Sequence, residues 1–223
     1  MLDLVLPRRC LVCGEGGGQL CAGCRAALPR VVPPLCERCG APTAWPVRRC
    51  RECSGRRLGF DQARAAVAYD GAVRRVVAAW KEHGLRRLAE DAADLVAERV
   101  PVPNADVVAF VPGDRARSSD RGHHPAQRLA EALAERWGMP CEPLLVRARP
   151  ARRQAGLPLA ERRRNVTGAF AVRTSPPESI VLVDDVYTTG STVSAAASAF
   201  RSAGAGRVDV VTFARTIRFF EAT

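Results

Sequence analysis

The chain has 223 residues, a formal net charge of +11 and a hydrophobic content of 47%. This length suffices for one α/β domain of ordinary size with a small satellite unit. No run of about 18 apolar residues occurs, and the apolar run 2–6 is interrupted by Asp3 and stops at Pro7, so we expect neither a membrane span nor a secretory signal. We therefore expect a cytoplasmic protein without membrane insertion.

The positive charge comes almost entirely from arginine, since Lys81 is the one lysine in the sequence. A genome rich in G and C would replace lysine by arginine and imply nothing about ligands. Arginine also forms paired hydrogen bonds to phosphate oxygens, which suits anionic partners. Codon bias explains the ratio of arginine to lysine but not the positive total, so we infer a polyanionic ligand.

Residues 1–58 form a cysteine-rich module. Eight of its cysteines fall into four Cys-x-x-Cys pairs, a spacing typical of metal thiolates rather than of disulfides. Two pairs supply the four thiolates that structural Zn²⁺ prefers, so one or two zinc ions are predicted, with the pairs taken either in sequence or interleaved. Iron–sulfur ligation is the alternative, and redox chemistry is disfavoured by the proline- and glycine-rich context. The predicted ligands are Cys10, Cys13, Cys21, Cys24, Cys36, Cys39, Cys50 and Cys53.

Because this segment has little apolar content, metal binding would supply most of its folding energy. From residue 63 onward the composition changes to apolar strands that alternate with helices rich in alanine, leucine and arginine. This alternation predicts an α/β domain over residues 60–223, with a parallel sheet flanked by helices. We expect strands at 63–69, 106–111, 142–146, 179–186 and 207–214, and helices at 72–82, 85–100, 125–137 and 191–203.

The segment 147–164 carries seven arginines, which makes it too basic and irregular for a core, and we expect it at the surface. It could cover an acceptor, follow a nucleic-acid backbone, or be a solvated face without a ligand. Only Phe170 lies near it among aromatic residues, so a base-stacking platform is poorly supported.

The segment 181–192 combines an apolar strand, an acidic pair, a small polar loop and the start of a helix. Asp184 and Asp185 would emerge at the carboxyl end of the strand, where α/β proteins bind ligands, as acceptors for vicinal hydroxyls or as indirect ligands of Mg²⁺. The loop that follows has small side chains, so its N–H groups and the helix N-terminus can surround a phosphate. The loop residues are Thr188, Thr189, Gly190, Ser191 and Thr192.

This segment resembles the signature of type I phosphoribosyltransferases, which bind 5-phosphoribosyl-1-diphosphate (PRPP). The resemblance implies that Asp184 and Asp185, the predicted catalytic residues, bind the ribose hydroxyls. It also implies that the loop holds the 5-phosphate and that Mg²⁺ accompanies the diphosphate.

A narrower resemblance covers nearly the whole chain and is to the competence protein ComF family. It rests on the four cysteine pairs, Trp80-Lys81, the segments 111–115 and 121–122, and the motifs at 154–157 and 161–170. The resemblance implies a diphosphate loop with Arg115 as its charge and Lys81 nearby, although Lys81 could equally be a solvated lysine on a helix. The loop residues are Val111, Pro112 and Gly113, and the candidate contacts of an acceptor or anion are Arg121, Gln154 and Arg162.

The chain departs from that family at residues 121–125, where Arg-Gly-His-His-Pro stands in place of the usual Arg-Gly-Phe-Asn-Gln. His123 and His124 could act as proton shuttles there, or could be loop histidines with no such task.

Two functions of different classes remain. The first is a pentosyl glycosyltransferase that moves the phosphoribosyl group of PRPP to a nitrogen acceptor. The second is an accessory factor that binds single-stranded DNA beside DNA-uptake or recombination proteins, with PRPP binding regulatory or vestigial.

Overall fold

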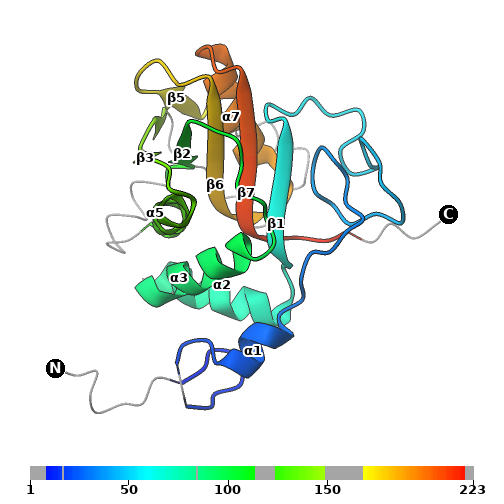
Figure 1. The fold of residues 1–223 in the computed structure, drawn as a ribbon, viewed down its shortest axis with the longest axis vertical. Coiled ribbons are helices and arrows are strands. Elements are labelled where there is room, and N and C mark those ends of the chain that lie inside the picture. The colour runs from blue at the N-terminus through cyan, green and yellow to red at the C-terminus, as the bar shows by residue number, and fades with distance from the viewer. Residues whose placement is uncertain (1–8, 17, 84, 114–123, 149–167, 219–223) are drawn as a thin grey trace.

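The computed structural model describes residues 9–16, 18–83, 85–113, 124–148 and 168–218. A five-stranded parallel sheet forms its centre, in the spatial order β1-β7-β6-β2-β3 (Figure 1). The strands are β1 (Gln62–Ala68), β2 (Val107–Phe110), β3 (Cys141–Glu142), β6 (Ser179–Tyr187) and β7 (Arg207–Arg215). The predicted parallel α/β sheet flanked by helices is confirmed.

Helices cover both faces of this sheet because successive side chains of each strand point to opposite faces. On β6, Val181 and Val183 join the core shared with α2 (Gly71–His83), α3 (Arg86–Ala97) and α5 (Pro125–Trp137). Ile180 and Leu182 join the core on the other face, shared with α7 (Ser191–Ser202). The near-continuous apolar run of β6 is therefore that of a strand buried on both faces.

Helix α5 begins and ends where the sequence provides caps. Pro125 occupies the first turn of α5, His124 accepts a hydrogen bond from the Gln127 N–H at 3.2 Å, and Gly138 ends the helix at a φ of 64°. Proline in the first turn and glycine at the C-terminal end are residue types that favour helix ends. The predicted strand 142–146 differs, because the structure divides it into β3 and β4 (Leu145–Arg147), which pairs antiparallel with β5 (Phe170–Val172).

The cysteine-rich segment packs against the α/β unit at two separate places (Figure 1). The part before residue 30 contains the short helix α1 (Ala22–Ala27), and its Leu20 and Leu28 are buried in the core formed with α2 and α3. The later part contributes Cys36, Cys39, Cys53 and Leu58 to the core beneath α7. The segment thus has little core of its own and shares the two cores of the sheet. No helix in the described part of the chain is long and apolar enough to cross a membrane.

Candidate functional site

Strands β6 and β2 are parallel neighbours, and their carboxyl ends lie where the strand order of the sheet changes direction. From β2 the chain continues to β3 on one side, and from β6 it continues to β7 on the other. Phe110 at the end of β2 lies level with Val183, so residues 184–187 of β6 extend past their neighbour. Ligands of open parallel sheets bind at such a reversal point.

Asp184 and Asp185 occupy this overhang, and Lys81 of α2 faces them. The Lys81 Nζ lies 2.8 Å from Asp185 Oδ2, and the Asp184 Oδ1 accepts a hydrogen bond from the Asp185 N–H at 2.9 Å. The sequence left open whether Lys81 is a solvated helix-face residue, and the structure instead gives it a carboxylate partner. Asp185 is 13% exposed and Lys81 40% exposed, so the pair lies at the rim of the site.

The pKa values at this site depend on the two carboxylates, Asp184 and Asp185, which lie beside one cation, Lys81. Burial, and then the charge of Asp185, raise the pKa of Asp184 to about 7, while the Lys81 ammonium opposes the rise. Burial by itself would lower the pKa of Lys81, but the carboxylates of Asp185 and Asp184 outweigh burial and raise it. Lys81 therefore stays charged, and Asp184 changes its protonation state near neutral pH.

The predicted phosphate loop, residues 188–192 and called the phosphate loop below, follows the carboxylates directly and leads into α7. Gly190 adopts a φ of 71°, a left-handed conformation that favours glycine, and serves as the N-cap without a side-chain hydrogen bond. Thr189 Oγ1 lies 2.8 Å from Ser191 Oγ and accepts a hydrogen bond from the Ser191 N–H at 3.2 Å. The start of α7 thus presents small hydroxyl side chains and the positive end of a helix dipole, which together suit an anion.

The predicted diphosphate loop lies across from this loop, at the end of β2. The Val111 N–H donates to the Val183 carbonyl at 3.0 Å, and the Gly113 backbone nitrogen lies in contact with His124 Nε2. His124 thus contacts this loop as well as capping α5. Four of the other predicted contacts lie outside the described residues: Arg115, Arg121, Gln154 and Arg162. His123 lies outside them as well.

Arg147 is a residue of this site that the sequence placed only within a basic surface run. Its Nε donates to the Pro112 carbonyl at 3.0 Å, and its guanidinium lies 4.9 Å from the centre of the Phe170 ring. Its charge also opposes the rise in the pKa of Asp184. The strand predicted at 142–146 could have placed Arg147 at a strand end. The direction of the Arg147 side chain, however, depends on the pairing of β4 with β5.

The eight paired cysteines form two separate four-sulfur centres. The first centre is Cys10, Cys13, Cys21 and Cys24, and the second centre is Cys36, Cys39, Cys50 and Cys53. Within each centre the four Sγ atoms lie within 4.8 Å of one another. Neighbouring pairs in sequence therefore combine, and the interleaved arrangement is wrong.

The donor geometry of both centres fits zinc. A tetrahedral ion with Zn–S bonds of about 2.3 Å separates its sulfurs by about 3.8 Å. Cys36 and Cys53 are 3.6 Å apart at Sγ, Cys39 and Cys50 are 3.5 Å apart, and Cys13 and Cys21 are 3.8 Å apart. Backbone N–H groups also point at the sulfurs, such as that of Cys50 at Cys36 Sγ, 3.3 Å away. Such donors stabilise thiolates, the form that binds metal.

Two clefts adjoin the segment that contains the second centre. One of about 780 Å³ lies between residues 55–57, β5 and α7, and touches the phosphate loop at Ser191. The other, of about 810 Å³, lies where strands β1 and β7 begin, at the end of these strands away from the carboxylate pair. We call it the arginine cleft. It is lined by Glu37, Arg38, Arg48, Arg49, Asp61, Gln62, Gly206 and Arg207.

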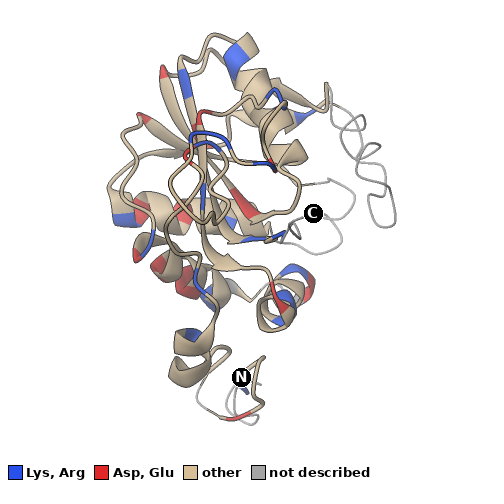
Figure 2. Cartoon of the chain, turned by 90° about the vertical axis from the view of Figure 1, so that its right-hand side faces the viewer, with Lys and Arg blue, Asp and Glu red and all other residues tan. Residues whose placement is uncertain are grey.

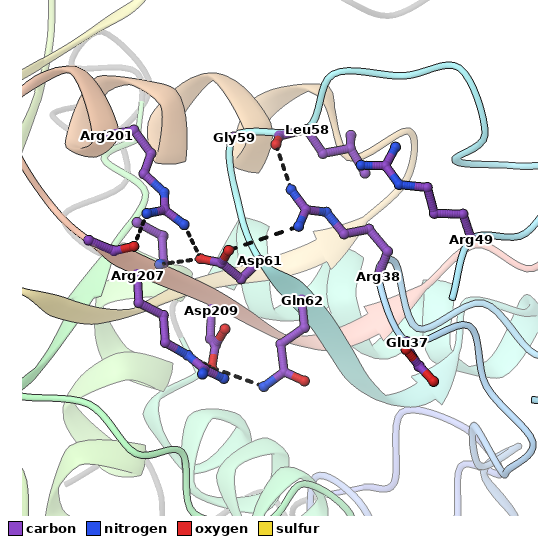
Figure 3. Close-up of polar contacts among 12 residues, drawn as sticks. Glu37, Arg38, Arg49, Leu58, Gly59, Asp61, Gln62, Arg201, Arg207 and Asp209 are labelled. Atoms are coloured by element: carbon purple, nitrogen blue, oxygen red, sulfur yellow. Dashed lines mark hydrogen bonds and ion pairs between the residues drawn. The ribbon is translucent and has the colours of Figure 1, made fainter. Parts of the chain in front are cut away.

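Several arginines of this region already have protein partners (Figure 3). Arg38 donates to the Leu58 carbonyl at 2.9 Å and lies 3.9 Å from Asp61, which also pairs with Arg201. Arg207 pairs with Asp209 at 2.9 Å. Figure 2 views the chain from this side and shows basic residues along the loops around the second centre.

Comparison with known proteins agrees with the cysteine geometry, and it finds relatives that match most of the chain. Residues 1–54 match the family model described as a double zinc ribbon domain. Competence protein F of Haemophilus influenzae is 25% identical in an alignment of 208 positions that covers 88% of this chain and 90% of that protein. The DNA utilization protein YhgH of Salmonella typhi is 27% identical in an alignment of 228 positions that covers 96% of this chain and all of that protein. The resemblance to the ComF family is confirmed.

Among solved structures, a glutamine PRPP amidotransferase from B. subtilis is 27% identical over 56% of this chain, with a TM-score of 0.38. The match takes up 25% of that protein, so this ComF-like chain resembles only about a quarter of it. A TM-score of this size supports no argument about the fold, which rests on the strand order and the two buried faces.

Proposed function

We propose that this protein binds PRPP with Mg²⁺ at the carboxyl edge of β6 and transfers its phosphoribosyl group to a nitrogen acceptor. The observation that carries the proposal is the succession along β6 of two carboxylates facing Lys81, followed at once by a helix start whose N-cap is Gly190, a residue without a side chain to cap it. A sugar that bears vicinal hydroxyls and a 5-phosphate would occupy both halves of such a site.

Each part of the site has a task in this reaction. Asp184 and Asp185 accept hydrogen bonds from the ribose hydroxyls and thereby fix C1 of the sugar. The phosphate loop holds the 5-phosphate, and residues 111–113 contact the diphosphate, for which the sequence also predicts the charge of Arg115. The Lys81 cation lies beside the two acids. Mg²⁺ suits these carboxylate oxygens and adds positive charge to the diphosphate when bound. Electrostatic stabilisation matters most on the diphosphate, since it gains charge in the transition state.

In the transfer itself the lone pair of the acceptor nitrogen forms a bond to C1. The C1–O bond to diphosphate breaks, its electron pair leaves with the diphosphate oxygen, and the nitrogen then releases a proton. The acceptor is defined here only as a nitrogen nucleophile.

Calorimetric titration with PRPP, with and without Mg²⁺, tests the binding step. We expect saturation below millimolar concentration for the native protein and loss of binding in Asp184→Asn and Asp185→Asn. Release of diphosphate in the presence of ammonia or free bases tests the transfer step. Absence of heat and saturation up to millimolar PRPP with Mg²⁺ would refute the proposal.

A second candidate function, the binding of single-stranded DNA, is favoured by the arginine cleft and by the name of the YhgH relative. Four arginines and two carboxylates line the cleft, so its lining is net positive. Among the described residues, no side chain forms an ion pair or hydrogen bond with the Arg48 guanidinium, and Arg49 donates from Nη1 to the Arg56 carbonyl. Guanidinium groups in such positions can contact phosphates, which makes binding dependent on salt. This function could coexist with PRPP binding, which would then be regulatory or vestigial.

The test is fluorescence anisotropy with a labelled single-stranded oligonucleotide over a series of salt concentrations. Replacing Arg48 and Arg49 by alanine should weaken binding and reduce the salt slope by about 0.7 for each phosphate that the variant no longer neutralises. A matched double replacement at Arg87 and Arg99, two exposed arginines in and after α3, should change neither. Equal effects of the two double variants would argue against a role for the cleft.

A further inference from the structure

We propose that the second cysteine centre is a positioning element of the phosphate loop, so that metal in this centre sets the affinity for PRPP. The inference rests on the proposed function for its ligand, but its structural basis is independent of that ligand. It depends on three connections between residues 36–60 and the segment that begins at Tyr187.

The first connection passes through Arg215, a buried arginine at the end of β7 that is 1% exposed. Its Nη1 donates to the Cys39 carbonyl at 2.5 Å, and its Nη2 lies 3.0 Å from Glu52 Oε2. Both partners belong to the second centre, since Glu52 lies between Cys50 and Cys53. A buried arginine without its carboxylate is strongly unfavourable, so these contacts tie β7 to the ordered form of the cysteine loops.

The same guanidinium is linked to the phosphate loop through the ring of Tyr187. It lies 5.0 Å from the centre of the Tyr187 ring, which is 2% exposed and packs edge-on against Phe60. A Cβ at Gly190 would overlap the Tyr187 ring and hydroxyl, so the backbone of the loop rests directly on this ring. A chain of contacts therefore runs from Cys39 and Glu52 to Arg215, from Arg215 to the Tyr187 ring, and from this ring to the backbone of Gly190.

The second connection is direct. Arg56, three residues after Cys53, donates from Nη2 to the Thr189 carbonyl at 2.7 Å. The Arg56 N–H in turn lies 3.3 Å from the Cys53 carbonyl, so the backbone of this arginine is held by the cysteine loop. A charged donor on a loop carbonyl fixes the direction of the neighbouring peptide groups, which are the groups that would contact a phosphate.

The third connection holds the start of α7. The Gly59 N–H donates to Ser194 Oγ at 3.1 Å, and a Cβ at Gly59 would overlap the Ser194 carbonyl and Ser198, so the two backbones are in close contact. The chain that leaves the second centre therefore packs on the first turns of the helix whose N-terminus forms the loop.

The first centre provides a contrast within the same chain. Leu11, Val12 and Cys24 pack on the core that α2 and α3 form, and Arg25 pairs with Glu98 at 2.5 Å. Within the described residues, no hydrogen bond or ion pair joins residues 9–28 to the phosphate loop. Loss of metal at the two centres should therefore have different effects. At the second centre, loss of metal frees the cysteine loops from their fixed positions. The ligand must then order the phosphate loop when it binds, and the free-energy cost of this ordering weakens binding.

The experiment compares two matched pairs of variants in calorimetric titrations with PRPP and Mg²⁺, well below the melting temperature of each variant and with zinc content measured. Cys50→Ser and Cys13→Ser each remove one thiolate from a four-cysteine centre. Arg56→Ala and Arg57→Ala each remove one of two adjacent arginines; among the described residues, Arg56 donates a hydrogen bond to the phosphate loop and Arg57 does not. We expect Cys50→Ser and Arg56→Ala to weaken PRPP binding about tenfold or more, and the two controls to bind as the native protein does.

Arg56→Lys, which keeps a cationic donor, should recover most of the affinity if the contact with Thr189 is responsible. Should Cys50→Ser fail to fold, the arginine pair decides, because its substitutions do not touch the metal ligands. Native affinity in Arg56→Ala, or in a zinc-depleted Cys50→Ser, would overturn the inference.

Hydrogen exchange without ligand separates this inference from the proposed function. Amides of residues 188–194 should exchange faster in Cys50→Ser than in Cys13→Ser or the native protein. If native protein fails to bind PRPP but this difference appears, the proposed function is wrong and the coupling stands. Equal exchange in the two variants would overturn the coupling whatever the ligand is.

Discussion

Replacing Asp184 with asparagine should stabilise the protein at pH 8 while removing its affinity for PRPP. The pKa of aspartate in an unfolded chain is about 3.9, whereas burial and the charge of Asp185 raise that of Asp184 to about 7 in the folded protein. Between these values the unfolded chain has released a proton that the folded chain still holds. The free energy of unfolding therefore falls as pH rises through this window.

A difference of about 3 pKa units corresponds to a loss of about 4 kcal/mol once the pH exceeds both values. Asp184 keeps partial access to solvent, so we expect about half of this, or about 2 kcal/mol. Asparagine has nearly the same shape and no charge to desolvate, so the variant should not show this loss. A carboxylate that weakens the fold at working pH is consistent with a residue kept for ligand binding.

Urea unfolding of the native protein and of Asp184→Asn at pH 5 and pH 8 measures this effect. The variant should gain stability over the native protein by about 1–2 kcal/mol between these two pH values. Glu142→Gln, which changes an exposed carboxylate on β3, serves as the control and should show no such gain. A variant less stable than native at pH 8, or a difference that does not change with pH, would refute the reasoning.

Three further predictions concern the cation, the loop and the metals. Lys81→Met removes the charge that opposes the high pKa of Asp184, so the pH midpoint of PRPP binding should move upward in titrations between pH 6 and 8.5, and an unchanged midpoint would exclude this coupling. Gly190→Ala should cost about 3 kcal/mol and remove PRPP binding, because its Cβ meets Tyr187, whereas Gly138→Ala, with a similar positive φ and open space around it, should cost about 1 kcal/mol by denaturant unfolding; equal costs would contradict this. Atomic absorption should find two zinc ions per chain, one for each four-cysteine centre, and a single ion would contradict the sulfur geometry.

The sheet and the carboxylate pair were predictable because their signals are local. An apolar strand followed by two acids, small residues and a helix leaves few alternatives, and β6 and α7 begin and end within a residue or two of their predicted limits. The same holds for α5, whose proline and glycine mark its ends. Sequence also indicated the four cysteine pairs, since the Cys-x-x-Cys spacing is fixed by the metal and not by the fold.

Contacts between distant segments were not predictable, because no local pattern encodes them. Arg215 ends an apolar strand and reads as a surface charge, yet Glu52 from the cysteine loops makes its burial tolerable. Arg56 is one of several arginines in a basic stretch, and only its position relative to Thr189 distinguishes it. The split of the predicted strand 142–146 likewise depends on β5, a partner that follows an intervening segment.

The two cysteine centres have the same spacing pattern, but the fold gives them different surroundings. One lies against the helices on the Lys81 side of the sheet, and the other lies on the α7 side, where the phosphate loop begins. A metal centre that only folds its own ribbon could be lost with local damage alone. The second centre also satisfies a buried arginine and packs on the segment that holds the predicted phosphate, so its folding energy is shared with the site. This sharing is the physical basis of the coupling that we propose between the second centre and the predicted phosphate loop.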